Sequence, residues 1–105
     1  MANSRVRVLT QVTACSGRES ELRDLLLQVV EQRCQKQGCI TCELLSHHIR
    51  SSDFILVEEW ELEARMKSTF SISSLEKLFE QGTGLIAEPP STNWYEVIHA
   101  QTCTT

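Results

Sequence analysis

The order in which strand-like and helix-like patterns follow one another most limits how this chain can fold. Apolar residues at every second position indicate a strand, and apolar residues at every third or fourth position indicate a helix. These patterns run strand, helix, strand, strand, helix, strand, over residues 6–14, about 17–37, 39–49, 54–61, 63–81 and 93–99. A β-α-β-β-α-β order predicts a four-stranded antiparallel sheet with both helices on one face, an α+β fold of the ferredoxin-like type.

The first helix carries signals at both of its ends. Ser16 and Glu19 stand at the spacing of a capping box, which satisfies free backbone N–H groups at a helix start. Gly38 follows the last turn, where glycine commonly ends a helix in the left-handed conformation. Apolar residues at helical spacing are expected to face the sheet: Leu22, Leu25, Leu26, Val29 and Val30.

The two middle strands should form a hairpin whose tight turn is 51–52. Pairing Arg50 with Asp53 across this turn sets the register of the hairpin. Because side chains alternate between the faces of a strand, the register decides which residues share a face. It places on one face His47, Leu45, Leu56, Glu58 and Trp60.

The third strand is apolar on both faces. Phe54, Leu56 and Trp60 lie on one face by alternation, and Ile55 and Val57 lie on the other. Two helices on the same side can cover only one face of the sheet. The other face needs a second layer, and a second copy of the sheet is the simplest candidate. We therefore expect a homodimer that forms through this face.

Charge and hydropathy narrow the class of protein. Fourteen acidic residues against ten basic ones give a net charge of -4, which argues against a nucleic-acid surface. No apolar run approaches the roughly 20 residues of a membrane span. The first four residues show no secretory signal. We expect one cytoplasmic domain over 1–105, with its core at about 6–98 and a polar tail at 100–105.

Five cysteines are an odd number for a disulfide framework, so we expect reduced thiols. Cys39 and Cys42 form a Cys-x-x-Cys pair, but no second pair supplies the spacing of a zinc site. The pair opens a strand rather than a helix, so the two side chains should point to opposite faces. Structural thiols are favoured, and redox sensing through Cys34, Cys39 or Cys42 remains the alternative.

Several short segments together resemble a known family. They are Ser16-Gly17-Arg18-Glu19, Gly38-Cys39-Ile40, Leu56-Val57-Glu58-Glu59-Trp60-Glu61, Gly84-Leu85 with Pro89-Pro90, and Tyr95-Glu96-Val97. Over about 6–98 the sequence is similar to the antibiotic biosynthesis monooxygenase domains, which form dimeric α/β barrels. The resemblance implies a pocket between sheet and helices in each subunit, where some members oxidise phenols or quinols with molecular oxygen and no cofactor.

The resemblance carries over unevenly to individual residues. Trp60 matches the pocket tryptophan of the cofactor-free oxygenases. Leu56, Leu45 and Thr69 stand where that type has polar side chains, and Glu80 stands near the position of its arginine. The haem-degrading type would need its own residues at Thr10, Thr69 and Phe79, none of which ligates iron. Neither haem nor another cofactor is therefore expected.

Substitute groups could supply the missing chemistry. We expect His47 and Glu58 as catalytic residues, because a histidine or a carboxylate in an apolar pocket can act as a general base. The alternatives are a solvated His47 and a Glu58 paired with an arginine. No metal ligand set is evident. The expected pocket lining is Thr10, Leu45, Leu56, Trp60, Met66, Thr69 and Phe70.

Two functions follow from these expectations. The first is a cofactor-independent monooxygenase that acts on a small aromatic or quinol-type substrate. The second is a non-catalytic, small-molecule-binding or stress-related dimer of the same fold, which the missing polar side chains would favour.

Overall fold

The computed structural model describes residues 5–61 and 74–104 of the chain. Its elements, in chain order, are β1 (Arg5–Thr13), α1 (Glu19–Cys34), β2 (Cys39–Ser46), β3 (Asp53–Glu61), α3 (Ser74–Glu80) and β4 (Ser91–Glu96). The strands form one sheet in the order β2-β3-β1-β4, and all neighbouring strands are antiparallel. The predicted ferredoxin-like fold is therefore confirmed. Most of the predicted second helix, with Met66, Thr69 and Phe70, lies outside the described residues.

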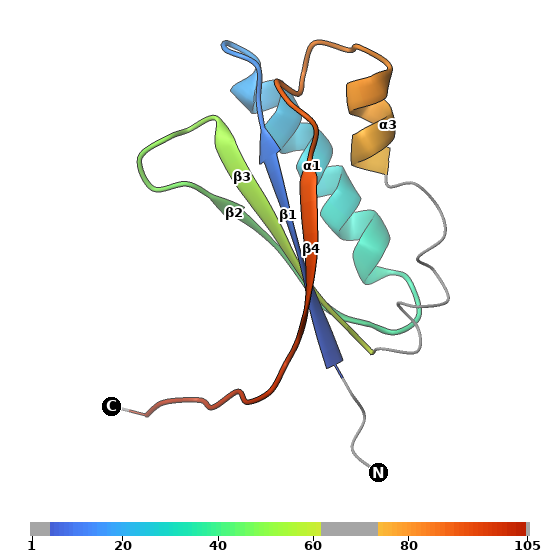
Figure 1. Ribbon diagram of the computed structural model, residues 1–105, viewed down its shortest axis with the longest axis vertical. Helices are drawn as coiled ribbons and strands as arrows, with labels where there is room; N and C mark the ends of the chain where they lie inside the picture. Colours follow the sequence, from blue (N-terminus) through green and yellow to red (C-terminus); the bar gives the residue numbers. More distant parts are fainter. Residues whose placement is uncertain (1–4, 62–73, 105) are drawn as a thin grey trace.

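Both helices lie on the same side of the sheet (Figure 1). The core fills the space between them and the inward side chains of β1 and β3. Val6, Val8, Thr10 and Val12 are all buried, as the alternation in β1 predicted. The face that carries these residues is called the covered face below.

α1 is shorter than expected, and its caps differ from the prediction. Arg18 is the N-cap residue and makes no side-chain capping bond, so the predicted capping box of Ser16 and Glu19 is wrong. The Glu19 carboxylate instead accepts a hydrogen bond from the Gly17 backbone N–H at 3.3 Å. Gly38 has a φ of +91°, in the left-handed region, and turns the chain into β2.

The register of the β2–β3 hairpin differs from the prediction by an odd number of residues. Cys42, not Leu45, lies opposite Glu58, which is a shift of three positions (45 to 42). An odd shift moves each side chain of β2 to the other face. Leu45 therefore lies opposite Ile55 and is 47% exposed, whereas Leu44 packs against the core.

The predicted turn does form, but it sits inside a longer loop. The Asp53 N–H donates to the Arg50 carbonyl oxygen at 3.1 Å, and the two side chains form an ion pair at 2.8 Å. Strand pairing resumes only where the His47 N–H donates to the Asp53 carbonyl oxygen at 2.8 Å. At the other end of β2, the register shifts between Cys39 and Thr41. The loop length, not the turn, therefore sets the register.

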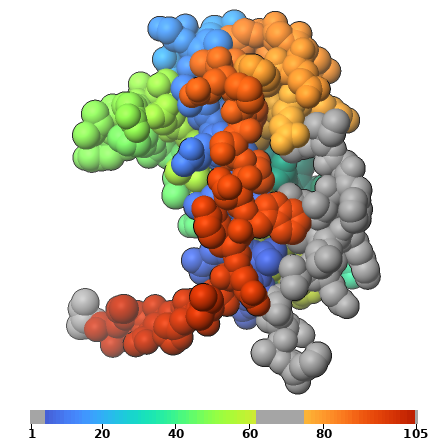
Figure 2. Space-filling view, in the orientation of Figure 1, coloured from blue at the N-terminus to red at the C-terminus, as the bar shows by residue number. Residues whose placement is uncertain are grey.

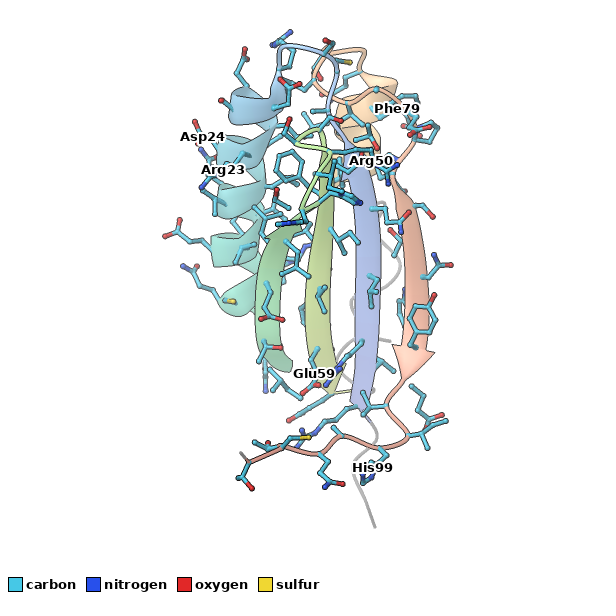
Figure 3. The ribbon with its side chains drawn as sticks, turned by 90° about the vertical axis from the view of Figure 1, so that its left-hand side faces the viewer. Arg23, Asp24, Arg50, Glu59, Phe79 and His99 are labelled. Atoms are coloured by element: carbon cyan, nitrogen blue, oxygen red, sulfur yellow. The ribbon has the colours of Figure 1, made fainter. Side chains whose placement is uncertain are left out.

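Neither α1 nor α3 covers the second face of the sheet, which is called the open face below (Figure 3). Its centre is apolar, with Leu9, Ile55 and Val57 all half-buried. Glu59 lies on the same face and pairs with Arg7 at 3.1 Å and with Arg5 at 3.5 Å. The third strand is thus apolar on both faces, as predicted.

Residues 97–104, called the C-terminal segment below, follow β4 without a helix or strand of their own. The segment leaves the domain on the side away from α1 and α3 (Figure 1) and extends beyond its body (Figure 2). Ile98 in this segment is 96% exposed. Within the described residues, no helix is long and apolar enough to cross a membrane.

Candidate functional site

A buried carboxylate on the covered face is the most unusual group of this domain. The Glu58 side chain of β3 is fully buried, and it accepts two hydrogen bonds. The Arg33 guanidinium donates to Oε2 at 2.6 Å, and the Trp60 indole Nε1–H donates to Oε1 at 2.9 Å. Glu58 and Trp60 are two residues apart on one strand, so their side chains share a face. We call Arg33, Glu58 and Trp60 the interior triad.

Arg33 reaches the triad from the last turn of α1. Its side chain is 15% exposed, against 0% for that of Glu58. A fully buried carboxylate remains charged only if a cation and hydrogen-bond donors replace its water. The contact at 2.6 Å therefore assigns a charge to both partners. Of the two roles predicted for Glu58, the structure shows the pairing with an arginine.

Arg33 is not one of the predicted site residues, although the sequence holds a signal for its position. Leu22, Leu26 and Val29 are the buried residues of α1. Their spacing of four and then three residues continues to position 33. A helix places residues with this spacing on one face, so Arg33 lies on the face that packs against the sheet.

Two thiols line the same interior region beside Glu58. Burial raises the pKa of the Cys39 thiol to about 11, and the nearby Cys34 and Glu58 add to the increase. Burial likewise raises the pKa of Cys42 to about 12, with Glu58 as the next largest cause. Both thiols are therefore protonated at neutral pH and are poor nucleophiles and poor metal ligands. Within 5–61 and 74–104, no group of three or more His, Cys, Asp or Glu could hold a metal ion.

A second polar contact lies between β1 and β4. The Thr10 and Thr92 hydroxyl groups are 3.3 Å apart, and Thr10 is buried. The two residues are register partners on the covered face, next to the pair Val8 and Trp94. Trp94 is 38% exposed, so this edge of the covered face is closer to solvent than the triad. Thr10 is one of the predicted site residues, and Thr92 is not.

The structure separates His47 and Leu45 from the other predicted site residues. His47 follows β2 in the hairpin loop and is exposed, and its Nδ1 accepts hydrogen bonds from the Ile49 and Arg50 N–H groups, both at 3.0 Å. The expectation that His47 and Leu45 share a face with Trp60 is wrong, because the hairpin register differs. Both residues instead line a surface hollow of about 440 Å³ that also includes Arg50 and Asp53.

The remaining described residues of the predicted site do come together. Thr10, Leu56, Glu58 and Trp60 are all buried on the covered face. Leu56 is fully buried and packs in the core cluster with Leu22 and Leu26. Trp60 packs in a neighbouring cluster with Val6 and Val8. Within 5–61 and 74–104, the covered face therefore offers an apolar wall beside the Glu58–Arg33 ion pair and the Thr10–Thr92 hydroxyl pair.

The family model for antibiotic biosynthesis monooxygenases matches residues 5–68, more than half of the chain. The chain belongs to the antibiotic biosynthesis monooxygenase family. No curated protein matches the sequence.

Solved structures share the fold of this family member at low sequence identity. A Deinococcus radiodurans protein, provisionally assigned as an antibiotic biosynthesis monooxygenase, has a TM-score of 0.76 at 19% identity, covering 95% of this chain and 99% of that chain. A Nitrosomonas europaea protein of unknown function has a TM-score of 0.75 at 18% identity, covering 97% of both chains. A Bacteroides thetaiotaomicron protein, described as a possible oxidoreductase, has a TM-score of 0.70 at 15% identity, covering 91% of this chain and 100% of that chain.

Proposed function

We propose that this family member is a cofactor-independent monooxygenase that oxidises a small aromatic or quinol-type substrate beside Trp60 on the covered face. One observation carries the proposal, namely the charged, fully buried Glu58 next to an indole ring. Apolar residues of similar volume often stabilise a core as well as a buried ion pair does. A carboxylate buried at this position therefore favours a role in chemistry over a role in stability.

The reaction can be written for an anthrone-type substrate. A base removes one proton from the ring CH₂ group, and the resulting carbanion gives its electrons to molecular oxygen. The hydroperoxide that forms then loses water. One oxygen atom stays on the ring carbon as a carbonyl group, and the other leaves in water with the two CH₂ hydrogens. In this scheme the substrate is oxidised, oxygen is reduced, and no cofactor is needed.

The interior triad would supply what this reaction requires from the protein. Glu58 is the proton acceptor, because a carboxylate has lone pairs beyond the two that Arg33 and Trp60 occupy. Arg33 keeps this carboxylate charged before the proton transfer. The Trp60 ring offers an aromatic surface to a planar substrate. Apolar walls exclude water and so protect the electron-rich intermediate.

Oxygen uptake with a panel of anthrones and hydroquinones tests the proposal. Glu58→Gln keeps the size of the side chain but removes the base, and we expect uptake to fall by about 10²–10⁴-fold. Glu21→Gln is the matched control, because Glu21 is an exposed carboxylate that pairs with Arg18 on α1. Its uptake should equal that of the wild type. Wild-type uptake no faster than the protein-free blank would refute the proposal.

The alternative, a non-catalytic small-molecule-binding dimer, rests on a different observation. Glu58 has its partners in Arg33 and Trp60, and the hydroxyl groups of Thr10 and Thr92 contact each other. Groups that satisfy one another within the chain have a structural role without any substrate. A compound from the same panel that raises the melting temperature without oxygen uptake would favour this alternative, because a ligand of the folded state stabilises it.

We also propose that the protein forms a homodimer through the open face. The support is the apolar centre of this face, Leu9, Ile55 and Val57, together with the C-terminal segment on the same side (Figure 1). Sedimentation equilibrium should show a dimer for the wild type and a folded monomer for Val57→Asp. Leu27→Asp is the control, because Leu27 is an equally apolar, 47% exposed residue of α1, and this variant should remain a dimer. A monomeric wild type would refute the proposal.

A further inference from the structure

A polar loop joins β2 to β3 at one end of the open face, where Figure 3 shows Arg50. The His47 ring folds back onto this loop, because its Nδ1 accepts hydrogen bonds from the Ile49 and Arg50 backbone N–H groups, both at 3.0 Å. A ring nitrogen that accepts hydrogen bonds carries no proton, so the proton of the ring is on Nε2. The loop therefore fixes the tautomer of His47 and leaves its Nε2–H as a hydrogen-bond donor.

The Nε2–H group of His47 lies beside a second donor, the Arg50 Nη2, at a distance of 3.4 Å between the two nitrogens. A guanidinium group only donates hydrogen bonds, and so does the Nε2–H of this tautomer, so the two groups cannot satisfy each other. Asp53 holds the guanidinium in this position through a contact with Arg50 Nε at 2.8 Å. We call His47 Nε2 and Arg50 Nη2 the donor pair. A carboxylate, whose oxygens only accept, is the group that fits this pair best.

The donor pair belongs to the surface hollow of about 440 Å³, a volume in the range of small-molecule sites. Leu45 and Ile55 give this hollow an apolar wall. Glu88 also lines it, is exposed, and makes no side-chain hydrogen bond or ion pair with another residue of 5–61 and 74–104. The hollow therefore combines two hydrogen-bond donors, an apolar wall and a carboxylate without a partner in the described part of the chain.

We propose that this hollow binds a small molecule in which an apolar chain joins a carboxylate to an ammonium group. The carboxylate accepts hydrogen bonds from the donor pair, the chain contacts Leu45 and Ile55, and the ammonium group pairs with Glu88. A ligand with a carboxylate alone would bring its charge near Asp53 and Glu88 without compensation, so the ammonium group gives selectivity. The inference does not depend on the proposed oxidation, since the hollow is separate from the interior triad.

The tautomer of His47 can be measured directly. A long-range proton–nitrogen NMR spectrum of the wild type at pH 8 should show the His47 ring with its proton on Nε2 and an accepting Nδ1. A proton on Nδ1 would remove the donor pair, and the proposal with it.

Three linear compounds test the binding itself. ε-Aminocaproate carries both charged groups on a flexible apolar chain, caproate lacks the ammonium group, and hexylamine lacks the carboxylate. Each is titrated into the nitrogen-labelled protein, with the backbone amides of Ser46, His47 and Ile55 as reporters of the hollow. We expect saturable shifts with ε-aminocaproate and about fivefold weaker binding of the other two compounds. No saturable shift with ε-aminocaproate, or equal affinity for all three, would overturn the proposal.

Two variants assign the charged groups of the ligand to their partners. Arg50→Met should weaken ε-aminocaproate and caproate alike by about fivefold, because it removes one member of the donor pair. Glu88→Gln should weaken ε-aminocaproate but not caproate, which has no ammonium group. Arg18→Met is the matched control, since Arg18 is also an exposed arginine paired with a carboxylate, that of Glu21, and does not line the hollow. Its binding should equal that of the wild type, and equally tight binding by Arg50→Met would overturn the location of the site.

A last variant separates this site from the proposed dimer. Ile55 lines the hollow and also belongs to the apolar centre of the open face, whereas Val57 does not line the hollow. The Val57→Asp variant should therefore bind ε-aminocaproate at least as tightly as the wild type. Loss of binding in a folded Val57→Asp protein would mean that the site needs the second copy, and it would overturn the assignment of the hollow to a single chain.

Discussion

The interior triad makes a sharp prediction about stability, tested by replacing Arg33 with methionine. Methionine has nearly the same helix propensity as arginine and keeps an unbranched side chain of similar length. The change therefore leaves the helix and most of the packing intact while it removes the charge. Glu58 remains fully buried, with one hydrogen bond from Trp60 and no cation beside it.

The expected cost follows from the burial of both partners. Removing one partner of a buried ion pair costs about 3–5 kcal/mol, because the other charge stays buried without compensation. Since the Arg33 side chain is 15% exposed, water can replace part of its effect, which favours the lower end, about 3 kcal/mol. For a domain of this size, that loss corresponds to a decrease of about 15 °C in the melting temperature.

A second substitution separates charge from packing. Glu58→Gln keeps an acceptor for the Trp60 indole and leaves Arg33 free to turn toward water, so it should cost only about 1–2 kcal/mol. The double variant, with both Arg33→Met and Glu58→Gln, should be more stable than Arg33→Met alone, because it contains no buried charge.

Urea unfolding, followed by circular dichroism at a fixed protein concentration, measures these differences. The concentration is fixed because self-association would change the apparent stability. Arg18→Met is the control, since Arg18 makes a bidentate but exposed contact with Glu21 on the same helix, and its loss should have only a small effect. A free energy of unfolding for Arg33→Met equal to that of the wild type would refute the existence of a charged, buried pair.

Three further predictions concern the register, the turn into β2 and the buried thiols. In urea unfolding, Leu44→Ala should lower the free energy of unfolding by about 2 kcal/mol, and Leu45→Ala should lower it by less than about 1 kcal/mol. A larger loss for Leu45→Ala than for Leu44→Ala would instead support the register predicted from the sequence. Gly38→Ala should lower stability by about 1–2 kcal/mol, because alanine resists a φ of +91°, and an unchanged unfolding midpoint would exclude this strain. Burial raises the pKa of Cys39 to about 11 and that of Cys42 to about 12, from an ordinary 9.0. At pH 8, iodoacetamide should therefore alkylate Cys39 about 100-fold more slowly in the folded protein than in the urea-unfolded chain. Mass spectrometry measures both rates. The unfolded thiols ionise first as the pH rises above 9, so the folded protein should lose stability between pH 9 and about 12.

The sequence by itself determined the fold and the buried face of each strongly patterned element. In β1, Val6, Val8 and Val12 alternate with polar residues, so only one face of the strand can be buried. In β3, Phe54, Leu56 and Trp60 occur at even spacing and predicted the covered face correctly. One of the segments that carry the antibiotic biosynthesis monooxygenase resemblance, Leu56-Val57-Glu58-Glu59-Trp60-Glu61, lies on β3.

Only the tertiary structure decided the register of β2 and the partner of Glu58. Leu44 and Leu45 are both apolar, so the alternation in β2 fits either face, and the three-position shift in the register reverses the choice. The turn between Arg50 and Asp53 was read correctly, yet it lies within a loop whose length no local signal specifies. The pairing of Glu58 with Arg33 joins residues 25 positions apart, and it depends on how α1 packs on the sheet. Local patterns specify which residues are buried, whereas contacts between elements specify which of the buried residues meet.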